Sequence, residues 1–436
     1  MADARPGFDL GQALARLEGA SPRRESGRVT EVTGLVVRAS VPGLRVGELV
    51  TIDDRLEAEV VGFRGDEVVL MPLGDAAGIG PDSLVTPTGR PFAIAASEAL
   101  LGRVLDGVGR PMDGGPALSG AEPWAVDRPA PDPLSRTRIS RALPLGVRAL
   151  DGLLTVGEGQ RIGLFAGSGV GKSTLMGQIA RQTEADVSVI ALVGERGREV
   201  VDFLEESLGP AGRARSVVVC ATSDAPSLVR LKAAFVATAV AEFFREQGRR
   251  VLFMLDSVTR VARAQREVGL AAGEPPARQG YPPSVFALLP RLLERTGTSA
   301  RGSITALYTV LVAGGDMEEP IADEVRGILD GHVILSRDIA ARNQWPAIDV
   351  LPSLSRLMST VADPEHRAAA SRLRELLAAY ERQRDLILLG AYQRGSDPTT
   401  DDAIARLDRI TAFLRQRTDE AAPFEDTKAR LRALVS

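Results

Sequence analysis

A glycine-rich run that ends in a lysine and two hydroxyl side chains is the part of the sequence with the plainest chemistry. It consists of Ala166, Gly167, Ser168, Gly169, Val170, Gly171, Lys172, Ser173 and Thr174. An apolar stretch precedes it and a helical pattern begins near Lys172, which is the context that a phosphate-binding loop requires. Glycines let successive backbone N–H groups turn inward around a phosphate, and the helix N-terminus adds its positive dipole end. The run predicts a nucleoside-triphosphate site from Gly167 to Thr174, although Ala166 stands where the strict pattern has glycine.

Two side chains of this loop have separate predicted roles. Lys172 can bridge the β- and γ-phosphate oxygens, and the Ser173 hydroxyl can ligate Mg²⁺. A further residue for Mg²⁺ is Asp256, which ends the apolar run 251–256. At the C-terminal end of a strand beside the loop, this carboxylate would hold the water shell of the ion. We therefore expect ATP and Mg²⁺ as ligands, with Ser173 and Asp256 on the metal side.

A carboxylate for hydrolysis follows another apolar run, 187–193. Glu195 lies in the charged segment 194–199, directly after that run. A carboxylate at a strand end beside the phosphate loop can accept a hydrogen bond from the attacking water and orient it toward the γ-phosphate. Glu195 is therefore the predicted catalytic carboxylate, whereas Arg198 is interpreted as part of a solvated surface cluster.

These residues need a sheet that brings several strand ends together. Apolar β-rich runs alternate with helical patterns, and the runs are 161–165, 187–193, 216–221, 251–256, 304–312 and 332–336. Runs that are apolar on both faces and separated by helices predict a parallel α/β sheet covered on both sides. The helix predicted at 226–247 has Asp224 as its expected N-cap and Pro226 in its first turn.

Other patterns divide the chain into segments. Short β-rich runs with turns between them predict a small closed or sandwiched β domain, and they are 32–37, 49–52, 56–63 and 67–72. The prolines between 129 and 133 predict a linker or a surface strap. Helices are predicted at 368–388, 402–416 and 424–434. We therefore expect a tail at 1–27, a β-barrel domain at 28–92, an ATPase core at 93–358 and a helical domain at 359–436. The tail is either frayed or a docking helix that presents Leu10, Leu14 and Leu17.

Composition excludes several classes of protein. A net charge of −4 and a pI near 5.6 supply no overall footprint for nucleic acid, so we expect no nucleic-acid partner. Cys220 is the only cysteine, which rules out an internal disulfide and favours a buried strand residue in a reducing compartment. The chain starts with no apolar signal region and has no long apolar span, so a cytoplasmic location is expected. His332 and His366 are too isolated to form a metal site and are interpreted as structural.

The whole set of motifs resembles one family, the type III protein-export ATPases, which are relatives of the rotary F- and V-type catalytic subunits. The resemblance rests on segments 165–174, 194–200, 255–260 and 262–267, and most specifically on 280–286, Gly-Tyr-Pro-Pro-Ser-Val-Phe. It extends over nearly the whole chain. It implies a homohexameric ring whose subunits have an N-terminal β-barrel, a RecA-like P-loop core and a C-terminal α-helical domain.

The resemblance also implies roles for individual residues. By analogy, Glu195 polarises the water, Glu199 supports the metal shell and Asp256 is the Walker B carboxylate, with Arg196 and Arg260 as supporting partners. Segment 343–350 resembles the part of the family that stacks an aromatic side chain on adenine. That aromatic is usually tyrosine, and Trp345 still offers a π-face here. Arg356 matches the arginine finger, which would reach the γ-phosphate bound to the neighbouring subunit.

The function implied by the resemblance is ATP hydrolysis in a type III protein secretion system that energises chaperone release, unfolding and export. Besides chaperones and secreted substrates, the implied partners are a central-stalk protein, a stator-like regulator at the N-terminal region and the export-gate membrane complex. They would hold the ATPase at the inner face of the cell membrane. We further hypothesise that the loop 280–286, with Tyr281, faces the central pore of the ring.

Four alternatives remain beside this reading. A flagellar export ATPase shares the chemistry, although the sequences of segments 317–326 and 224–232 favour the injectisome branch. A rotary F/V-type catalytic subunit is disfavoured because segment 390–397 looks like the export family, where F-type subunits carry an acidic turn. A regulatory subunit without turnover is disfavoured by Lys172, Glu195 and Asp256 occurring together. A ring-shaped RNA helicase is disfavoured by the acidic balance and the aromatic content of 4%.

Overall fold

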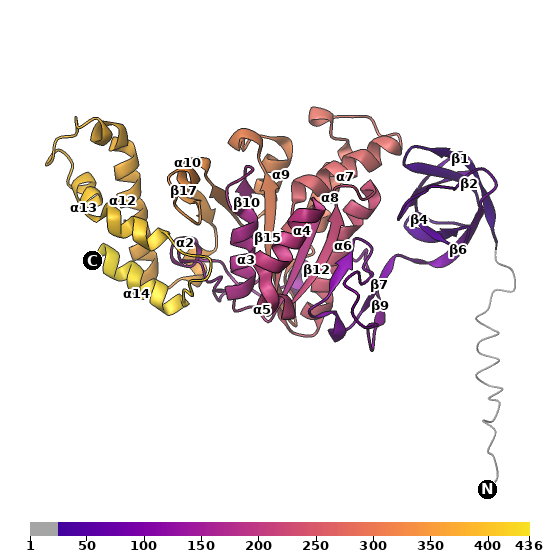
Figure 1. Ribbon diagram of the computed structural model, residues 1–436, viewed down its shortest axis with the longest axis horizontal. Coiled ribbons are helices and arrows are strands. Elements are labelled where there is room, and N and C mark those ends of the chain that lie inside the picture. The colour runs from indigo at the N-terminus through magenta and orange to yellow at the C-terminus, as the bar shows by residue number, and fades with distance from the viewer. Residues whose placement is uncertain (1–24) are drawn as a thin grey trace, which may run out of the picture. The chain divides into compact units, whose positions relative to one another are not determined.

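The computed structural model describes residues 25–436, which form two compact units that divide between Phe92 and Ala93 (Figure 1). The first unit contains only strands, and the second contains a large sheet, its covering helices and a helical C-terminal region. The predicted docking helix with Leu10, Leu14 and Leu17 lies outside the described residues. No helix within residues 25–436 is both long and apolar enough to cross a lipid bilayer.

The first unit is a closed β-barrel, as the resemblance predicts. Its strands are β1 (Gly27–Thr33), β2 (Val36–Ser40), β3 (Glu48–Ile52), β4 (Leu56–Arg64), β5 (Glu67–Pro72) and β6 (Leu84–Pro91). They join in the order β1-β2-β5-β4-β3-β6, so each strand has two neighbours. Alternate side chains such as Val37, Val50 and Val60 point inward and are completely buried. Closure leaves no unpaired strand edge to attract another chain.

One strand of the barrel was predicted wrongly. The run 32–37 was expected to be a single strand, but it is the turn of a hairpin in which Val32 pairs with Val37 across the β1–β2 ladder. Gly34 has a φ of +59°, a left-handed conformation that glycine adopts without steric cost. Strand β6 was not predicted because Pro87 and Pro91 interrupt its pattern.

The second unit is built on a nine-stranded sheet. Its strands are β8 (Val104–Asp106), β10 (Arg161–Ala166), β11 (Val187–Glu195), β12 (Ser216–Thr222), β13 (Arg250–Asp256), β14 (Gly297–Thr298), β15 (Ser303–Leu311), β16 (Gly331–Leu335) and β17 (Ile348–Ser355). The main path is β17-β16-β10-β15-β13-β11-β12-β8, and β14 pairs with β15. All pairings along the path are parallel except that of β16 with β17. The predicted parallel α/β core is therefore confirmed. The antiparallel edge strand β17 was not predicted. A separate two-stranded sheet pairs β7 (Ala93–Ala96) with β9 (Glu122–Ala125).

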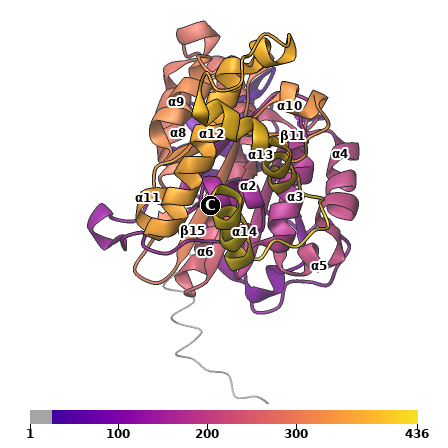
Figure 2. The same ribbon diagram turned by 90° about the vertical axis from the view of Figure 1, so that its left-hand side faces the viewer.

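Helices cover both faces of this sheet: in Figure 2, α8 and α9 lie on one side and α3, α4 and α5 on the other. The helices are α2 (Arg148–Leu153), α3 (Lys172–Gln182), α4 (Gly197–Asp202), α5 (Gly209–Ala214), α6 (Ser227–Glu246), α7 (Val258–Ala271), α8 (Pro283–Leu293), α9 (Pro320–Ile328), α10 (Arg337–Ala341) and α11 (Met358–Val361). Because both faces are covered, every residue of β11 is buried. Cys220 is buried in β12, as expected.

The predicted N-cap of α6 is wrong. The helix starts at Ser227 and Pro226 occupies the N-cap position, with no side-chain hydrogen bond to the first turn. Asp224 belongs to the preceding turn, in which the Ala225 N–H donates to the Thr222 carbonyl, and its carboxylate bonds Thr222 instead. Pro226 fixes an extended backbone before the helix, so a carboxylate two residues earlier cannot reach the free N–H groups.

The C-terminal region contains the three predicted helices, α12 (Pro364–Leu388), α13 (Pro398–Leu414) and α14 (Phe424–Val435). The first two begin about four residues earlier than expected because each follows an aspartate cap and has proline in its first turn.

Arg148 of α2 holds this region on the core. Its backbone N–H donates to Gln416 Oε1 at 2.8 Å, its Nε donates to the Phe413 carbonyl at 2.8 Å, and its guanidinium pairs with Glu420.

A fully buried ion pair joins α6 to the segment after α8. Arg295 Nε and Nη2 donate to the two carboxylate oxygens of Glu242 at 2.8 and 2.7 Å, and both side chains are 1% exposed. Arg295 Nη1 also donates to the carbonyl of Val126 at 2.8 Å, so its donors reach the chain that leaves β9. Such a pair stabilises the core only while both partners are present.

We expect Glu242→Ala to lower the free energy of unfolding of the second unit by about 3–5 kcal/mol, because it leaves the Arg295 cation buried without a counterion. Urea unfolding followed by far-UV circular dichroism measures this loss. A matched surface change, Glu365→Ala, removes the exposed partner of Arg432 and should cost no more than about 1 kcal/mol. An equal effect of the two substitutions would contradict the prediction.

Candidate active site

The phosphate loop lies at the carboxyl end of β10, near the middle of the large sheet. Strand β10 ends at Ala166 and α3 begins at Lys172, so the loop joins a strand to a helix N-terminus. Gly169 and Gly171 each have a φ of +76°, which explains why glycine stands at both positions. A Cβ built on Gly169 would meet no atom within 4 Å, so that part of the loop is open. In α/β sheets of this kind, ligands bind outside the carboxyl ends of the strands.

Three of the predicted residues come together beside this loop. Lys172 Nζ contacts Asp256 Oδ1 and lies 3.6 Å from Glu195 Oε1. Asp256 ends β13 and Glu195 ends β11, and these two strands are neighbours in the sheet. Thr309 of β15, which was not among the predicted residues, donates its hydroxyl to Asp256 Oδ1 at 2.7 Å. Its place on a strand next to β13 is visible only once the strand order is known.

Glu195 has the most unusual environment of the group. Its Oε2 accepts a hydrogen bond from Arg260 Nη2 at 3.1 Å, while its buried Oε1 has no hydrogen-bond partner among the described residues. Burial, a hydrogen bond to Glu199 and the charge of Asp256 raise the pKa of Glu195 to about 7, against the attraction of Lys172 and Arg260. The same hydrogen bond lowers the pKa of Glu199. A carboxylate with one oxygen that accepts no hydrogen bond and with a pKa near neutrality is suited to accept a proton from water.

The segment between β16 and β17 lies against the loop at two points. A Cβ on Gly171 would come within 2.8 Å of the Trp345 ring, which is 38% exposed. Arg337 was not predicted, yet a Cβ on Gly167 would come within 2.9 Å of its guanidinium, which also lies 3.5 Å from Ser168 Oγ. Arg337 begins α10 two residues after the end of β16, the parallel neighbour of β10, so it shares the carboxyl edge with the loop.

The donors available for a metal ion fit magnesium bound together with a nucleotide. Within residues 25–436, no group of three or more histidine, cysteine, aspartate or glutamate side chains is placed to hold a metal. Ser173 is exposed in the first turn of α3, and Asp256 contacts the neighbouring Lys172. Mg²⁺ ordinarily binds one or two protein oxygens and takes its remaining ligands from phosphates and water. The two predicted residues therefore suit a nucleotide-bound ion rather than a site made by protein alone.

Arg356 is not near the phosphate loop of its own chain. Its backbone N–H donates to the Asp330 carbonyl at 3.0 Å, just before β16. Ser355 pairs with Gly331 at the start of β16, whereas Leu335 at the other end pairs with Ala166. At about 3.3 Å per residue, the length of β16 separates the two positions by roughly 15 Å. The side chain is exposed at the edge of the sheet opposite the loop.

The remaining predicted residues have ordinary surroundings. Arg196 and Arg198 are 80% and 90% exposed and pair with Glu199 and Asp202. The Tyr281 ring is 9% exposed, packs near Phe286 and lies under Arg266, so it joins α7 to α8 and is not a free surface side chain. The ring nitrogens of His332 and His366 donate to the carbonyls of Pro352 and Gly152, both at 2.9 Å.

Comparison with known proteins identifies the family. The chain matches the β-barrel domain of the ATP synthase alpha/beta family over residues 29–89 and its nucleotide-binding domain over 146–355. Residues 362–433 match the C-terminal domain of the type III secretion ATPase EscN. The type 3 secretion system ATPase of Xanthomonas euvesicatoria is 55% identical over 93% of this chain and 92% of its own length. The flagellum-specific ATP synthase of Bacillus subtilis is 53% identical over 94% and 95%.

The chain belongs to the type III secretion and flagellar export ATPases. The solved structure of the assembled ATPase EscN from the enteropathogenic E. coli type III secretion system agrees, with a TM-score of 0.90 and 46% identity over 94% of this chain and 100% of EscN. A second structure shows EscN in complex with its central stalk EscO. The predictions of an ATP hydrolase, and of a barrel, an α/β core and a helical region, are confirmed. The two branches of the family match this ATPase almost equally well.

The pKa of Glu195 predicts how turnover depends on pH. If the ionised carboxylate accepts the proton, kcat/KM should fall about tenfold per pH unit below about 7, because protonation removes the base. Glu199→Ala removes one of the contacts that raise this pKa, so the acidic limb should move to lower pH. ATP hydrolysis measured from pH 5.5 to 8.5 tests both statements, with the exposed Glu205→Ala as control. A limb that Glu199→Ala leaves in place would contradict the assignment.

Proposed function

We propose that this ATPase hydrolyses Mg-ATP at the Lys172 site and uses the energy to release chaperones from export substrates and unfold them during type III secretion. One observation carries the proposal. Lys172, Glu195 and Asp256 meet at one edge of the sheet, while Arg356 is exposed at the opposite edge. A site with the base and phosphate ligands on one face and the arginine on another is complete only between two subunits.

In this proposal, the loop residues Gly167 to Thr174 bind the phosphates through backbone N–H groups, and Lys172 neutralises their charge. Glu195 takes the proton of the attacking water, with Arg260 and Glu199 setting its orientation and its pKa. Ser173 and Asp256 hold Mg²⁺, which when bound polarises the phosphate oxygens.

Two further side chains complete the proposed site. Trp345, which lies against Gly171, stacks on the adenine. Arg356 of the adjacent subunit stabilises the charge that develops on the transferred phosphoryl group. In this arrangement, nucleotide affinity depends on Trp345 of the subunit that binds ATP, and turnover depends also on Arg356 of the adjacent subunit.

We infer that the functional assembly is a homohexameric ring, by analogy with the assembled EscN. The same analogy supports a central-stalk partner, since EscN binds EscO. A stator-like regulator at residues 1–27, the export-gate membrane complex and secreted substrates with their chaperones complete the proposed partners at the inner face of the cell membrane.

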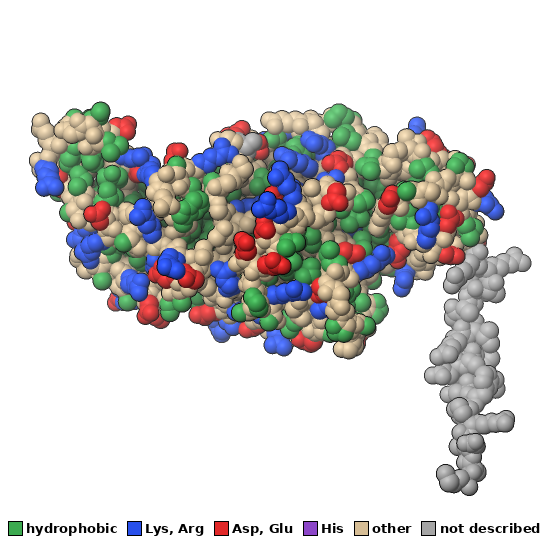
Figure 3. Space-filling view, viewed as in Figure 1, with side chains coloured by type: hydrophobic (Ala, Val, Ile, Leu, Met, Phe, Trp, Pro, Cys, Tyr) green, Lys and Arg blue, Asp and Glu red, His purple; other side chains and the backbone are tan. Residues whose placement is uncertain are grey.

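The injectisome branch is our first choice, and the flagellar export branch is the second candidate because of the 53% identity to the Bacillus subtilis protein. The alternative of a rotary F/V-type catalytic subunit has less support, since residues 362–433 match the C-terminal domain of the secretion ATPase. Nucleic acid is not proposed as a partner. On the face shown in Figure 3, positive and negative side chains are interspersed and form no continuous basic groove.

Arg356→Ala tests the assembly of the site from two subunits. We expect nucleotide affinity to be unchanged and turnover of the assembled ring to fall by about 10³-fold or more, because the arginine acts only on the transition state. Equilibrium binding of a fluorescent ATP analogue and steady-state hydrolysis measure the two effects. The exposed Arg367→Ala is the control. Normal turnover of Arg356→Ala in intact rings would remove the finger from the proposal.

Trp345→Ala tests the adenine contact. Loss of a stacking aromatic costs about 1–3 kcal/mol, so the KM for ATP should rise by about 5- to 150-fold while kcat changes little. Trp345→Tyr keeps a π-face and should restore a KM close to that of the unmodified chain. Nucleotide titrations at saturating Mg²⁺ provide the measurement. If Trp345→Ala and Trp345→Tyr had the same KM, stacking would not be the role of this ring.

A further inference from the structure

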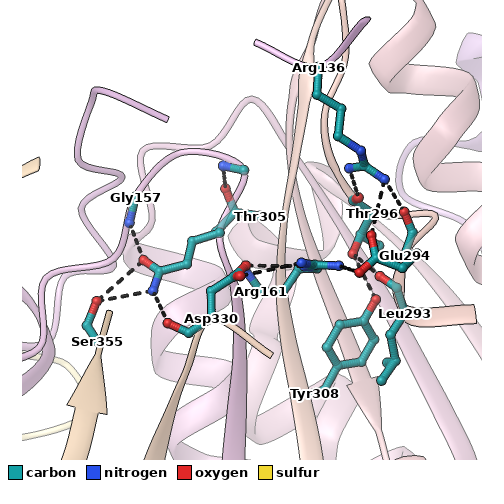
Figure 4. Close-up of polar contacts among 12 residues, drawn as sticks. Arg136, Gly157, Arg161, Leu293, Glu294, Thr296, Thr305, Tyr308, Asp330 and Ser355 are labelled. Atoms are coloured by element: carbon teal, nitrogen blue, oxygen red, sulfur yellow. Dashed lines mark hydrogen bonds and ion pairs between the residues drawn. The ribbon is translucent and has the colours of Figure 1, made fainter. Parts of the chain in front are cut away.

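A network of polar side chains lies at the amino end of β10, opposite the phosphate loop (Figure 4). We call it the edge network, and it consists of Arg136, Gln160, Arg161, Glu294, Asp330 and Ser355. Arg136 and Gln160 precede β10, Arg161 is the first residue of β10, Glu294 follows α8, Asp330 precedes β16 and Ser355 ends β17. None of them contributes to the cluster around Lys172.

The centre of the edge network is the ion pair between Arg161 and Asp330. Asp330 Oδ2 accepts hydrogen bonds from the backbone N–H and the Nε of Arg161, both at 3.1 Å, and the Asp330 N–H donates to the Arg161 carbonyl at 2.9 Å. Arg161 Nη1 pairs with Glu294, whose backbone carbonyl accepts from Arg136. Backbone and side chain together therefore hold residue 330 against the first residue of β10.

The chain around Arg356 is attached to this ion pair. The Arg356 N–H and Gln160 Nε2 both donate to the Asp330 carbonyl, at 3.0 Å each. Ser355 Oγ donates to the Thr155 carbonyl at 2.8 Å and accepts from Gln160 Nε2 at 3.1 Å. Gln160 is completely buried, and its Oε1 accepts from the Gly157 N–H at 2.8 Å. The chain at Arg356 is thus held by the backbone N–H of Arg356 itself and by the side chain of the preceding Ser355.

The guanidinium of Arg356 contrasts with this firmly held backbone. It is exposed, and within residues 25–436 it makes no hydrogen bond or ion pair. An arginine that acts on a neighbouring subunit needs a backbone that is held in place and a guanidinium that is not bonded within its own chain. A shift of about 1 Å in a catalytic group can cost on the order of 100-fold in rate, so the fixed backbone has a direct kinetic value.

We propose that the edge network, centred on Arg161 and Asp330, is a positioning device for Arg356 that sets the rate of hydrolysis in the adjacent subunit. This inference rests on the proposed role of Arg356. It makes β10 the common support of two sites: its carboxyl end carries the phosphate loop of one subunit, and its amino end holds the arginine that serves the next.

Asp330→Ala is the direct test. It removes the acceptor for Arg161, so kcat of the assembled ring should fall by between about 10- and 100-fold with the KM for ATP unchanged. Asp330→Asn keeps an oxygen acceptor and should recover part of the loss. Asp127→Ala breaks an exposed arginine–aspartate pair with Arg291 and should leave kcat unchanged. Ring assembly is checked by light scattering, and Gln160→Ala replaces Asp330→Ala if the latter does not assemble.

Mixed rings separate positioning in trans from damage to the variant's own site. Asp330→Ala subunits keep an intact nucleotide site, and Lys172→Ala subunits keep an intact Arg356 with its support. When the two are mixed, some intact nucleotide sites face an intact arginine, so turnover should exceed the mean of the two pure preparations. Glu195→Gln mixed with Lys172→Ala is the control that should show no such gain, because every site in those rings is defective.

The outcomes distinguish this inference from the proposed function. Unchanged kcat for Asp330→Ala, or a lower kcat without gain in mixed rings, overturns the positioning role while Arg356→Ala still tests the finger. Normal turnover of Arg356→Ala overturns both. A raised KM for ATP in Asp330→Ala also overturns the inference, because positioning of a transition-state arginine leaves substrate binding intact.

Discussion

The contact of one lysine with two buried carboxylates is the interaction on which the proposed chemistry depends. Lys172, Glu195 and Asp256 have side chains only 12%, 10% and 3% exposed. Burial of charge is costly unless the charges are paired, and here Lys172 contacts both carboxylates while Arg260 pairs with Glu195. Burial, the hydrogen bond to Glu199 and the charge of Asp256 raise the pKa of Glu195, the residue proposed to take a proton. The open turn at Gly169 leaves access beside it.

A parallel sheet is what makes this cluster possible. The carboxyl ends of β10, β11 and β13 lie along one edge; a helix begins two residues after β11 and β13 end, and α3 follows β10 after the phosphate loop. The opposite edge is equally structured, because Arg161 and Asp330 join the start of β10 to the chain that carries Arg356. Strand β10 therefore carries the phosphate loop at its carboxyl end and contacts, at its amino end, the chain that carries Arg356. This arginine is not near the phosphate loop of its own chain. Under the proposed role of Arg356, the two parts form a complete site only between subunits of a ring.

The parts outside the sheet have clear physical reasons for their separate folds. The barrel closes on itself and needs no partner strand. The helical region depends on the core, because Arg148 contacts four residues at the end of α13 or between α13 and α14, namely Phe413, Arg415, Gln416 and Glu420. Trp345 links the same region to the phosphate loop: its ring lies against Gly171 and its carbonyl accepts from the Gln416 N–H at 2.9 Å. Trp345 thus contacts both the phosphate loop and the chain that leads out of α13.

The sequence by itself determined the phosphate loop, the six main strands and the three C-terminal helices, since these depend on local spacing and on glycine, proline and aspartate at fixed positions. It missed the hairpin at Gly34 and misplaced the cap at Asp224, because one glycine and one proline outweighed an apolar or capping pattern. Only the tertiary structure decided that Thr309 and Arg337 adjoin the site and that Arg356 lies at the far edge. Strand order sets those relations, and it arises from pairings between residues distant in the chain, which no local pattern encodes.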